Sequence, residues 1–356
     1  MSRKAFLVLA GLTLLGVSWT HAGGLQPPAG SSWEVQTRGR DTNLRGVSAV
    51  RVRGTNAFAV WASGSNGVIL FSGDGGKSWD SRAVFGAEKL DFRGVVGLDS
   101  QTAYAMASGE GAASRIYKTT DGGKSWQQQY TGNRKEVFLD AIVCISGNRC
   151  FALGDPVDGK FLLLSTSDGK AWRELPSDHM PVATAAEGAF AASGTCLAIW
   201  SEREIYFVTG GGPAARVFRS KDLGTTWSVS ETPIVSGKAS SGIFSIARAG
   251  KTVIVVGGDY KEPARSERVA AYSSDEGTTW KLAEAQPRGY RSAIAFLGNN
   301  SFLAAGPLGA DFTSDGGRHW SAAGDFDLNA LSFADSAHGW AVGAKGLIAR
   351  CMPGAR

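Results

Sequence analysis

Apolar positions along this chain come in short runs that turn-forming residues separate. Near the start, runs at residues 46–52, 57–62 and 68–71 are followed by a fourth at 79–84. Glycine, asparagine, serine and aspartate fill most of the gaps between them. Short runs bounded in this way are typical of β-strands, and helical periodicity is weak throughout. The pattern predicts an all-β protein built from four-stranded antiparallel units.

One turn sequence recurs six times between these runs. Its first copy ends at Trp79 and reads Ser-Gly-Asp-Gly-Gly-Lys-Ser-Trp, and the third copy, which ends at Trp172, is one residue shorter. The aspartates of the six copies are Asp74, Asp121, Asp168, Asp222, Asp275 and Asp315, and the tryptophans are Trp79, Trp126, Trp172, Trp227, Trp280 and Trp320. The aspartates of successive copies lie 40 to 54 residues apart, which is typical of a repeat architecture.

The chemistry of this turn predicts a structural role. An aspartate can accept hydrogen bonds from backbone N–H groups just after it, and glycine two places later permits a positive φ. The tryptophan begins the next strand and buries a large ring between neighbouring units. The turn resembles the Asp box, or BNR repeat. We therefore expect the six aspartates to shape turns and not to act as catalysts.

The repeats predict a seven-bladed β-propeller. Residues 330–350 supply three strands after the last turn, and residues 32–37, with Trp33, resemble the strand that follows each turn. If the N-terminal strand completes the last blade, the ring closes without an exposed sheet edge. The fourth blade is ambiguous, since its first strand fits either 188–192 or 196–200.

Residues 1–22 have the pattern of a secretory signal. A charged start is followed by an apolar stretch that is too short for a membrane span and ends at Thr-His-Ala22. We expect cleavage after Ala22 and export to a bacterial periplasm or beyond. Residues 23–356 are then expected to form one propeller domain, monomeric and without a membrane span.

The chain has four cysteines, and their positions predict which of them form a disulfide. Cys144 and Cys150 flank Ile-Ser-Gly-Asn-Arg, which reads as a tight turn between two paired strands. Such a turn can set the two Cβ atoms face to face, so we expect a disulfide; two buried thiols are the alternative. Cys196 and Cys351 lie far apart in the sequence and are not assigned. No Cys/His cluster indicates a metal site, and no cofactor is expected.

The candidate binding site lies where the innermost strands begin, around the central funnel. Arg45, Arg93 and Arg291 occupy equivalent positions in three repeats, and Asp140 and Asn329 share this register. Because arginine binds carboxylates and phosphates bidentately, three such side chains predict a patch for an anion or an acidic partner. The alternative is that each arginine pairs with a local acid such as Asp41, Asp91 or Asp327.

Loops on the same face add further candidates. These are Asp155, Asp158, Arg216, Asp259 and Tyr260, together with Glu187, which precedes the ambiguous strand of the fourth blade. Glu187 is the candidate for a hydrolytic acid in the funnel. Asp155 and Asp158 have the chemistry of calcium ligands, but the loop spacing of a calcium site is absent.

Charge and motif content narrow the function classes. The net charge of +5 is mild and no run of Lys or Arg occurs, so nucleic acid is a poor candidate partner. The chain has only four histidines, and none is placed to build a Ser-His-Asp triad. Phosphate-binding and dinucleotide-binding loops are also missing.

The C-terminal repeat resembles one family closely. The stretch Phe-Ala-Asp-Ser-Ala-His-Gly-Trp-Ala-Val-Gly at residues 333–343, with the Asp-Gly-Gly-x-x-Trp turns, is similar to Ycf48/HCF136-type photosystem II assembly factors and their bacterial relatives. This resemblance implies a non-enzymatic scaffold that helps to assemble a membrane complex. The loops at 154–160 and 257–268 are longer than in the compact family pattern and fit the bacterial relatives better.

The sequence therefore favours an exported scaffold that binds a protein partner on its funnel face, either an acidic segment or a subunit of a membrane complex. The alternative is a sialidase-like glycoside hydrolase or lyase with carboxylates in the funnel. The Arg-Ile-Pro motif of sialidases is absent, and their propellers have six blades. A pair of buried carboxylates in the funnel would favour the alternative.

Overall fold

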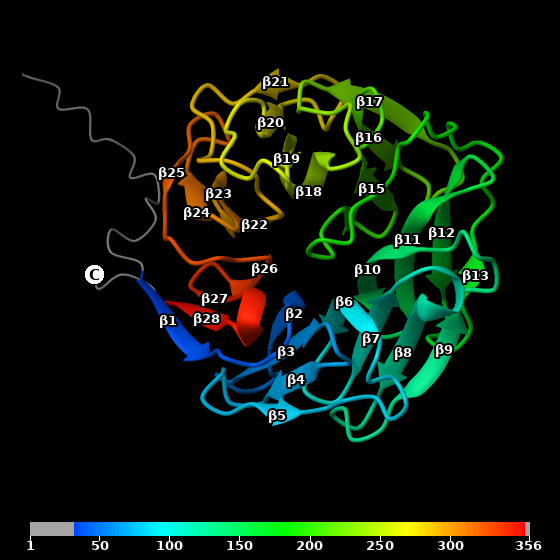
Figure 1. Ribbon diagram of the computed structural model, residues 1–356, viewed down its shortest axis with the longest axis vertical. Coiled ribbons are helices and arrows are strands. Elements are labelled where there is room, and N and C mark those ends of the chain that lie inside the picture. Colours follow the sequence, from blue (N-terminus) through cyan, green and yellow to red (C-terminus); the bar gives the residue numbers. More distant parts are fainter. Residues whose placement is uncertain (1–31, 353–356) are drawn as a thin grey trace, which may run out of the picture.

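Seven four-stranded antiparallel sheets are arranged as blades around a central funnel (Figure 1). This computed structural model describes residues 32–352, and the predicted signal sequence lies outside them. The all-β, seven-bladed prediction is confirmed. The described chain contains no α-helix, only the two short 3₁₀ turns η1 (Gly111–Ala113) and η2 (Ala344–Gly346), and correspondingly no helix long and apolar enough to cross a bilayer.

The first three blades follow the chain in order. Blade 1 contains β2 (Leu44–Arg51), β3 (Phe58–Gly64), β4 (Ile69–Ser72) and β5 (Asp80–Ser81). Blade 2 contains β6 (Asp91–Gly97), β7 (Ala103–Ser108), β8 (Arg115–Thr119) and β9 (Gln127–Thr131). Blade 3 contains β10 (Leu139–Ser146), β11 (Arg149–Val157), β12 (Lys160–Thr166) and β13 (Arg173–Glu174).

The remaining blades repeat this arrangement. Blade 4 contains β14 (Leu197–Trp200), β15 (Glu204–Val208), β16 (Ala215–Ser220) and β17 (Ser228–Thr232). Blade 5 contains β18 (Ser241–Ala249), β19 (Thr252–Asp259), β20 (Ala270–Ser273) and β21 (Lys281–Leu282), and blade 6 contains β22 (Ala293–Gly298), β23 (Ser301–Gly306), β24 (Gly309–Thr313) and β25 (Ser321–Ala322). Blade 7 contains β26 (Ala330–Asp335), β27 (His338–Val342), β28 (Ile348–Met352) and, on its outer edge, β1 (Ser32–Thr37).

The two ends of the described chain close the ring. Strand β1 pairs antiparallel with β28, with Trp33 opposite Cys351, and the two strands lie side by side in Figure 1. Trp33 Nε1 also donates to the carbonyl of Ala323 in blade 6 at 3.1 Å. Gln36 accepts from Trp340 Nε1 at 3.1 Å and donates to Gly75 O of blade 1 at 3.2 Å. The N-terminal strand thus completes the last blade, as expected, and links it to both neighbours.

The structure decides between the two alternatives for the first strand of blade 4, and it shows a shorter outer strand in blade 1 than predicted. The first strand of blade 4 is Leu197–Trp200, the second of the two alternatives, and residues 188–192 enter the funnel instead. The outer strand of blade 1 covers only Asp80–Ser81 of the expected 79–84. It ends early because Val84 and Ala87 leave the sheet and pack into the core between blades 1 and 2.

The repeated turns satisfy their own polar groups. Ser72 Oγ accepts from Gly76 N at 2.7 Å and donates to Asp74 Oδ1 at 2.8 Å. Asp74 then accepts from Ser78 N at 3.0 Å, and Gly76 has φ +91°, which favours glycine. The same bonds recur around Asp121, where those from Ser125 hold the pKa of the carboxyl at about 2. These carboxylates are turn acceptors, which is the role that the sequence predicted.

Half of the turn tryptophans reach back to the preceding blade. Trp126 Nε1 donates to Arg82 O in blade 1, Trp172 Nε1 to Gln129 in blade 2, and Trp280 Nε1 to Ser230 in blade 4. Trp79, Trp227 and Trp320 bond glycine carbonyls within their own turns. The repeated turn therefore also fixes the packing of adjacent blades.

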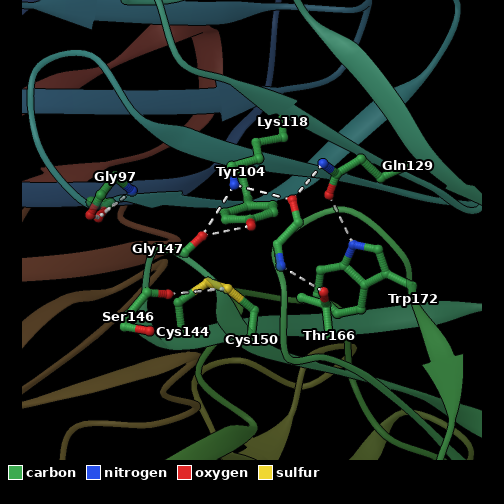
Figure 2. The surroundings of a disulfide bond; sticks show 12 residues. Gly97, Tyr104, Lys118, Gln129, Cys144, Ser146, Gly147, Cys150, Thr166 and Trp172 are labelled. Atoms are coloured by element: carbon green, nitrogen blue, oxygen red, sulfur yellow. Dashed lines mark hydrogen bonds between the residues drawn. A yellow bond between two sulfur atoms is a disulfide. The ribbon is translucent and has the colours of Figure 1, made fainter.

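A disulfide joins Cys144 and Cys150, which are directly paired in β10 and β11 (Figure 2). The turn that it closes packs on blade 2, where Tyr104 Oη donates to Gly147 O at 2.9 Å and Lys118 Nζ to the same oxygen at 3.2 Å. The expected bridge is confirmed. Cys196 and Cys351 are free thiols, the first of them buried.

Removing the disulfide is expected to cost about 2 kcal/mol of unfolding free energy, because the bridge closes a short loop. We expect Cys144→Ala/Cys150→Ala to lower the urea midpoint and to abolish the response of the protein to reducing agent. Cys351→Ala is the control and should keep that response. Equal midpoints for the double variant and the parent would contradict this prediction.

Candidate functional site

The candidate site is a cavity of about 550 Å³ in the funnel, at the end where the innermost strands begin. Polar residues, most of them at the start of those strands, line it together with aromatic residues. The polar residues are Arg45, Arg93, Asp140, Asp155, Ser292 and Asn329, and the aromatic ones are Phe138, Phe190, Phe244, Tyr260 and Tyr290. The repeats imply that the strand starts occupy equivalent positions, and the structure does bring most of the predicted residues together in this cavity.

Arg45 is the unpaired cation of this cavity. It is half-buried at the start of β2 and makes no hydrogen bond or ion pair with any residue between 32 and 352. Burial, and then the nearby Arg93 guanidinium, lower the pKa of Arg45. A guanidinium held beside another one without a fixed counter-charge is suited to bind an anion.

Arg93 is already engaged by the protein. Its Nε donates to Asp91 at 2.7 Å, which is one of the local acids considered from the sequence. Its Nη1 lies 3.5 Å from the carbonyl of Ala191, and the guanidinium lies 5.9 Å from the centre of the Phe138 ring. Arg93 therefore adds positive charge to the cavity, and its Nη2 makes no hydrogen bond with any residue between 32 and 352.

Arg291 does not line the cavity, which corrects the expectation of three equivalent arginines. Its side chain is fully buried and pairs with Asp311 of β24, and its Nη1 donates to Tyr290 O at 2.8 Å. Asp311 also binds Arg288 at 3.0 Å. The partner acid belongs to another strand of the same blade and is not the local Asp327, so the sequence register could not reveal it.

Asp140 and Asp155 form an acidic pair in the cavity. Asp140 is only 1% exposed, and its Oδ2 has no hydrogen-bond partner among the described residues. Burial and the neighbouring Asp155 raise the pKa of Asp140 well above its ordinary value. Asp155 accepts from Ala189 N at 3.0 Å, and burial raises its pKa to about 6.

Residues 184–195, here named the funnel segment, cross the central opening between β13 and β14 (Figure 1). Gly188 pairs with Gly210 of blade 4, Phe190 stacks on Phe244 of blade 5 at 3.9 Å, and Ser193 Oγ donates to Ser292 O at 2.7 Å. On the other side, Asp155 and Arg93 bind its backbone. The segment is thus anchored to several blades and forms one wall of the cavity. The sequence signal for it was the ambiguity of the first strand of the fourth blade.

Glu187 and Arg216 form a buried ion pair within the wall of the funnel. Arg216 Nε donates to Glu187 Oε1 at 2.8 Å, and Arg216 Nη2 contacts Glu187 Oε2. Thr209 Oγ1 donates to Glu187 Oε1 at 2.5 Å. Burial acts to raise the pKa of Glu187, but the bonds from Arg216 and Thr209 hold it below its ordinary value. An ionised, saturated carboxylate cannot donate a proton to a substrate, so Glu187 is a structural residue and not the hydrolytic acid considered from the sequence.

The other predicted residues are divided between the cavity and its rim. Tyr260 lines the cavity with 47% of its surface exposed, and Asn329 donates to Asn43 Oδ1 at 2.6 Å and to Leu44 O at 2.8 Å. Asp259 is buried beside Lys238 at 3.3 Å, whereas Asp158 is exposed on the turn after β11. No group of three or more His, Cys, Asp or Glu side chains in residues 32–352 is placed to hold a metal ion.

Structure comparison identifies propellers of the same kind. A solved structure described as YCF48 bound to D1 peptide superposes with a TM-score of 0.64 at 17% identity, over 90% of this chain and 96% of that chain. YCF48 from Cyanidioschyzon merolae superposes with a TM-score of 0.66 at 16% identity, over 90% of this chain and 99% of that chain. The fold is that of YCF48. The resemblance noted in the sequence is confirmed at the level of the fold, which is all that identities this low establish.

A third structure and the sequence comparisons complete the picture. The extracellular domain of the one-component system BT4673 from B. thetaiotaomicron gives a TM-score of 0.58 at 12% identity and covers 89% of this chain, but only 39% of that chain is matched. No family model matches the sequence, and no curated protein matches it.

Replacing Glu187 is expected to destabilise the protein strongly. Glu187→Gln leaves the Arg216 guanidinium buried without its counter-charge, which costs about 3–5 kcal/mol of unfolding free energy. The matched control is Glu174→Gln, which breaks an exposed pair with Arg134 and should cost less than about 1 kcal/mol. Chemical denaturation measures both, and similar losses in the two variants would contradict the assignment.

Asp155 predicts a specific pH dependence. In the folded protein the pKa of Asp155 is about 6, whereas its ordinary value is 3.8. Ionisation of Asp155 therefore opposes folding. Its contribution to stability is complete below about pH 4 and is lost as the pH rises through 6. Relative to Asp155→Asn, the parent protein should lose up to about 3 kcal/mol between pH 4 and 7. A stability difference that stays constant over this range would contradict the prediction.

Proposed function

We propose that this protein is an exported, non-enzymatic scaffold that binds an acidic segment of a protein partner in the funnel cavity. The observation that carries the proposal is Arg45, a half-buried guanidinium that lines a cavity of about 550 Å³ and has no hydrogen-bond or ion-pair partner in the described chain. Arginines elsewhere in the walls of the funnel, such as Arg216 and Arg291, are saturated by acids. Arg45 therefore retains the capacity to bind a carboxylate from outside.

Two further observations support a protein partner. The YCF48 propeller, which shares this fold, has been solved with a D1 peptide bound. Four of the exposed large hydrophobic side chains, Phe85, Val182, Tyr260 and Leu308, lie in loops at the same end of the blades as the cavity, and Tyr260 lines it. Export rests on the sequence of residues 1–22, which the structure does not describe.

Binding accounts for the cavity better than hydrolysis does. A glycosidase needs two carboxylates that reach the scissile bond from opposite sides. Asp140 is 1% exposed, and both Asp140 and Asp155 accept hydrogen bonds from the backbone of the funnel segment. Glu187 is ionised and forms a buried ion pair with Arg216. Asp140 and Asp155 both belong to blade 3, so they approach an occupant of the cavity from one blade and not from opposite sides of a scissile bond.

The test uses a fluorescent octapeptide with two adjacent Asp residues and a matched peptide with Asn in their place. We expect the acidic peptide to bind more tightly, and Arg45→Gln to weaken it about tenfold or more, because a charge-assisted hydrogen bond contributes roughly 1.5–3 kcal/mol. Fluorescence anisotropy at two salt concentrations measures the dissociation constants.

Arg53→Gln is the matched control. It removes the same charge from an exposed turn between β2 and β3, at the opposite end of the blade. This variant should bind as the parent protein does. If both substitutions weaken binding equally, the net charge of the protein explains the effect and the proposed site is wrong. An undiminished affinity in Arg45→Gln would also overturn the proposed site.

A further inference from the structure

The charges that line the cavity are sorted by blade. The two arginines lie at the starts of β2 and β6, in blades 1 and 2, whereas Asp140 and Asp155 both belong to blade 3. The aromatic wall comes largely from the funnel segment and from blades 5 and 6. An occupant of the cavity thus meets a cationic side, an acidic side and an apolar side.

Asp140 differs from every other buried acid of the described chain. Four acidic side chains are buried there, and three of them contact a cation: Glu187 contacts Arg216, Asp259 contacts Lys238, and Asp311 contacts Arg288 and Arg291. Asp140 has no ion pair, and its Oδ2 accepts no hydrogen bond from residues 32–352. A buried polar atom left unpaired in this way destabilises the protein until something binds it.

No cation of the described chain pairs with Asp140. Arg93 is the cation whose charge acts on it, but the Nε of Arg93 is bound to Asp91 and its Nη1 faces Ala191 O. Asp155, the other acid of the pair, bonds the backbone N–H of Ala189 and no side chain among residues 32–352. The raised pKa values of both carboxyls agree with this shortage of cations.

The remainder of the lining suits an organic cation. Phe138, Phe190, Phe244, Tyr260 and Tyr290 present aromatic rings to the same cavity, and such rings attract ammonium groups and pack against alkyl chains. A hard metal ion needs six or more oxygen ligands, and a third acid to help provide them is not grouped with Asp140 and Asp155 in the described structure.

We propose that Asp140 and Asp155 bind a primary ammonium group, so that the partner segment carries a lysine close to the carboxylate that Arg45 binds. This inference rests on the proposed function, since it specifies the chemistry of the same occupant. It goes beyond that function in assigning a cation site to blade 3. The preferred segment is then amphoteric and not simply acidic.

The first experiment varies the lysine. A panel of acidic octapeptides carries Lys one to four residues from the Asp pair, and each has a matched peptide with norleucine in place of Lys. We expect at least one Lys peptide to bind about tenfold more tightly than its norleucine match. If Lys confers no advantage at any position, the inference is overturned.

Variants then locate the effect. Asp155→Asn and Asp140→Asn should each remove the advantage of Lys over norleucine, while Asp158→Asn should keep it. Asp158 is the matched control, because it is an exposed acid close to Asp155 in the sequence and does not line the cavity. A Lys advantage that persists in both Asp155→Asn and Asp140→Asn would place the ammonium elsewhere and overturn the inference.

A second measurement separates this inference from the proposed function. Butylammonium chloride at millimolar concentrations should raise the melting temperature of the parent protein more than 1-butanol does, and this difference should vanish in Asp155→Asn. That result supports the cation site even where acidic peptides fail to bind. Acidic peptides that bind through Arg45, with no effect of butylammonium, would leave the proposed function intact and overturn the ammonium site.

Discussion

The pairing of β1 with β28 is the constraint on which the rest of this structure depends. It joins the first described residues to the last ones and supplies the outer strand that blade 7 would otherwise lack. Gln36 and Trp33 of the closing strand also bond to blades 1 and 6, so one strand holds three blades together. Because the ring is closed, the starts of seven innermost strands must converge on one funnel. The positions of the cavity residues at the strand starts, such as Arg45 and Asp140, follow from that convergence.

The carboxylates of the repeated turns differ from the two acids of the cavity in how far their oxygens are hydrogen-bonded. On the turn face, aspartates such as Asp121 accept several hydrogen bonds within their own turn, and their pKa values fall. In the funnel, Asp140 and Asp155 each accept one backbone hydrogen bond from the described residues, and burial raises their pKa values. Satisfied acids stabilise the repeat, whereas unsatisfied ones retain the capacity to interact with something else. This asymmetry makes the funnel, and not the repeated turns, the place to look for binding.

The funnel segment gives this propeller its individual character. It fills part of the central opening, brings Phe190 against Phe244, and engages Asp155 and Arg93 through its backbone. It is held at its base by the buried pair of Glu187 and Arg216. A repeat fold whose blades are nearly equivalent thus acquires an asymmetric cavity from one long connection. The same scaffold can in this way present different chemistry in different proteins.

Local chemistry in the sequence was sufficient for the fold. The repeated turn, the strand-length apolar runs and Trp33 predicted seven blades and their closure, because each depends on residues within one repeat or on a period that counts repeats. The pairing of Cys144 with Cys150 was predictable for the same reason, since the two flank a single turn. The register of the innermost strands also placed Arg45, Arg93, Asp140 and Asn329 together.

Tertiary structure decided what each of those side chains can do. Arg291 is saturated by Asp311, Glu187 by Arg216, and Asp140 by no cation of the described chain, and every one of these outcomes depends on residues brought together from different strands or loops. The sequence does not show which residue a charged side chain pairs with when that partner belongs to another strand or loop. The sequence by itself determined the ring and four of the polar residues that line its centre, Arg45, Arg93, Asp140 and Asn329. Only the packing of distant segments determined which of those residues remain available, because ion pairing and burial are properties of neighbours in space.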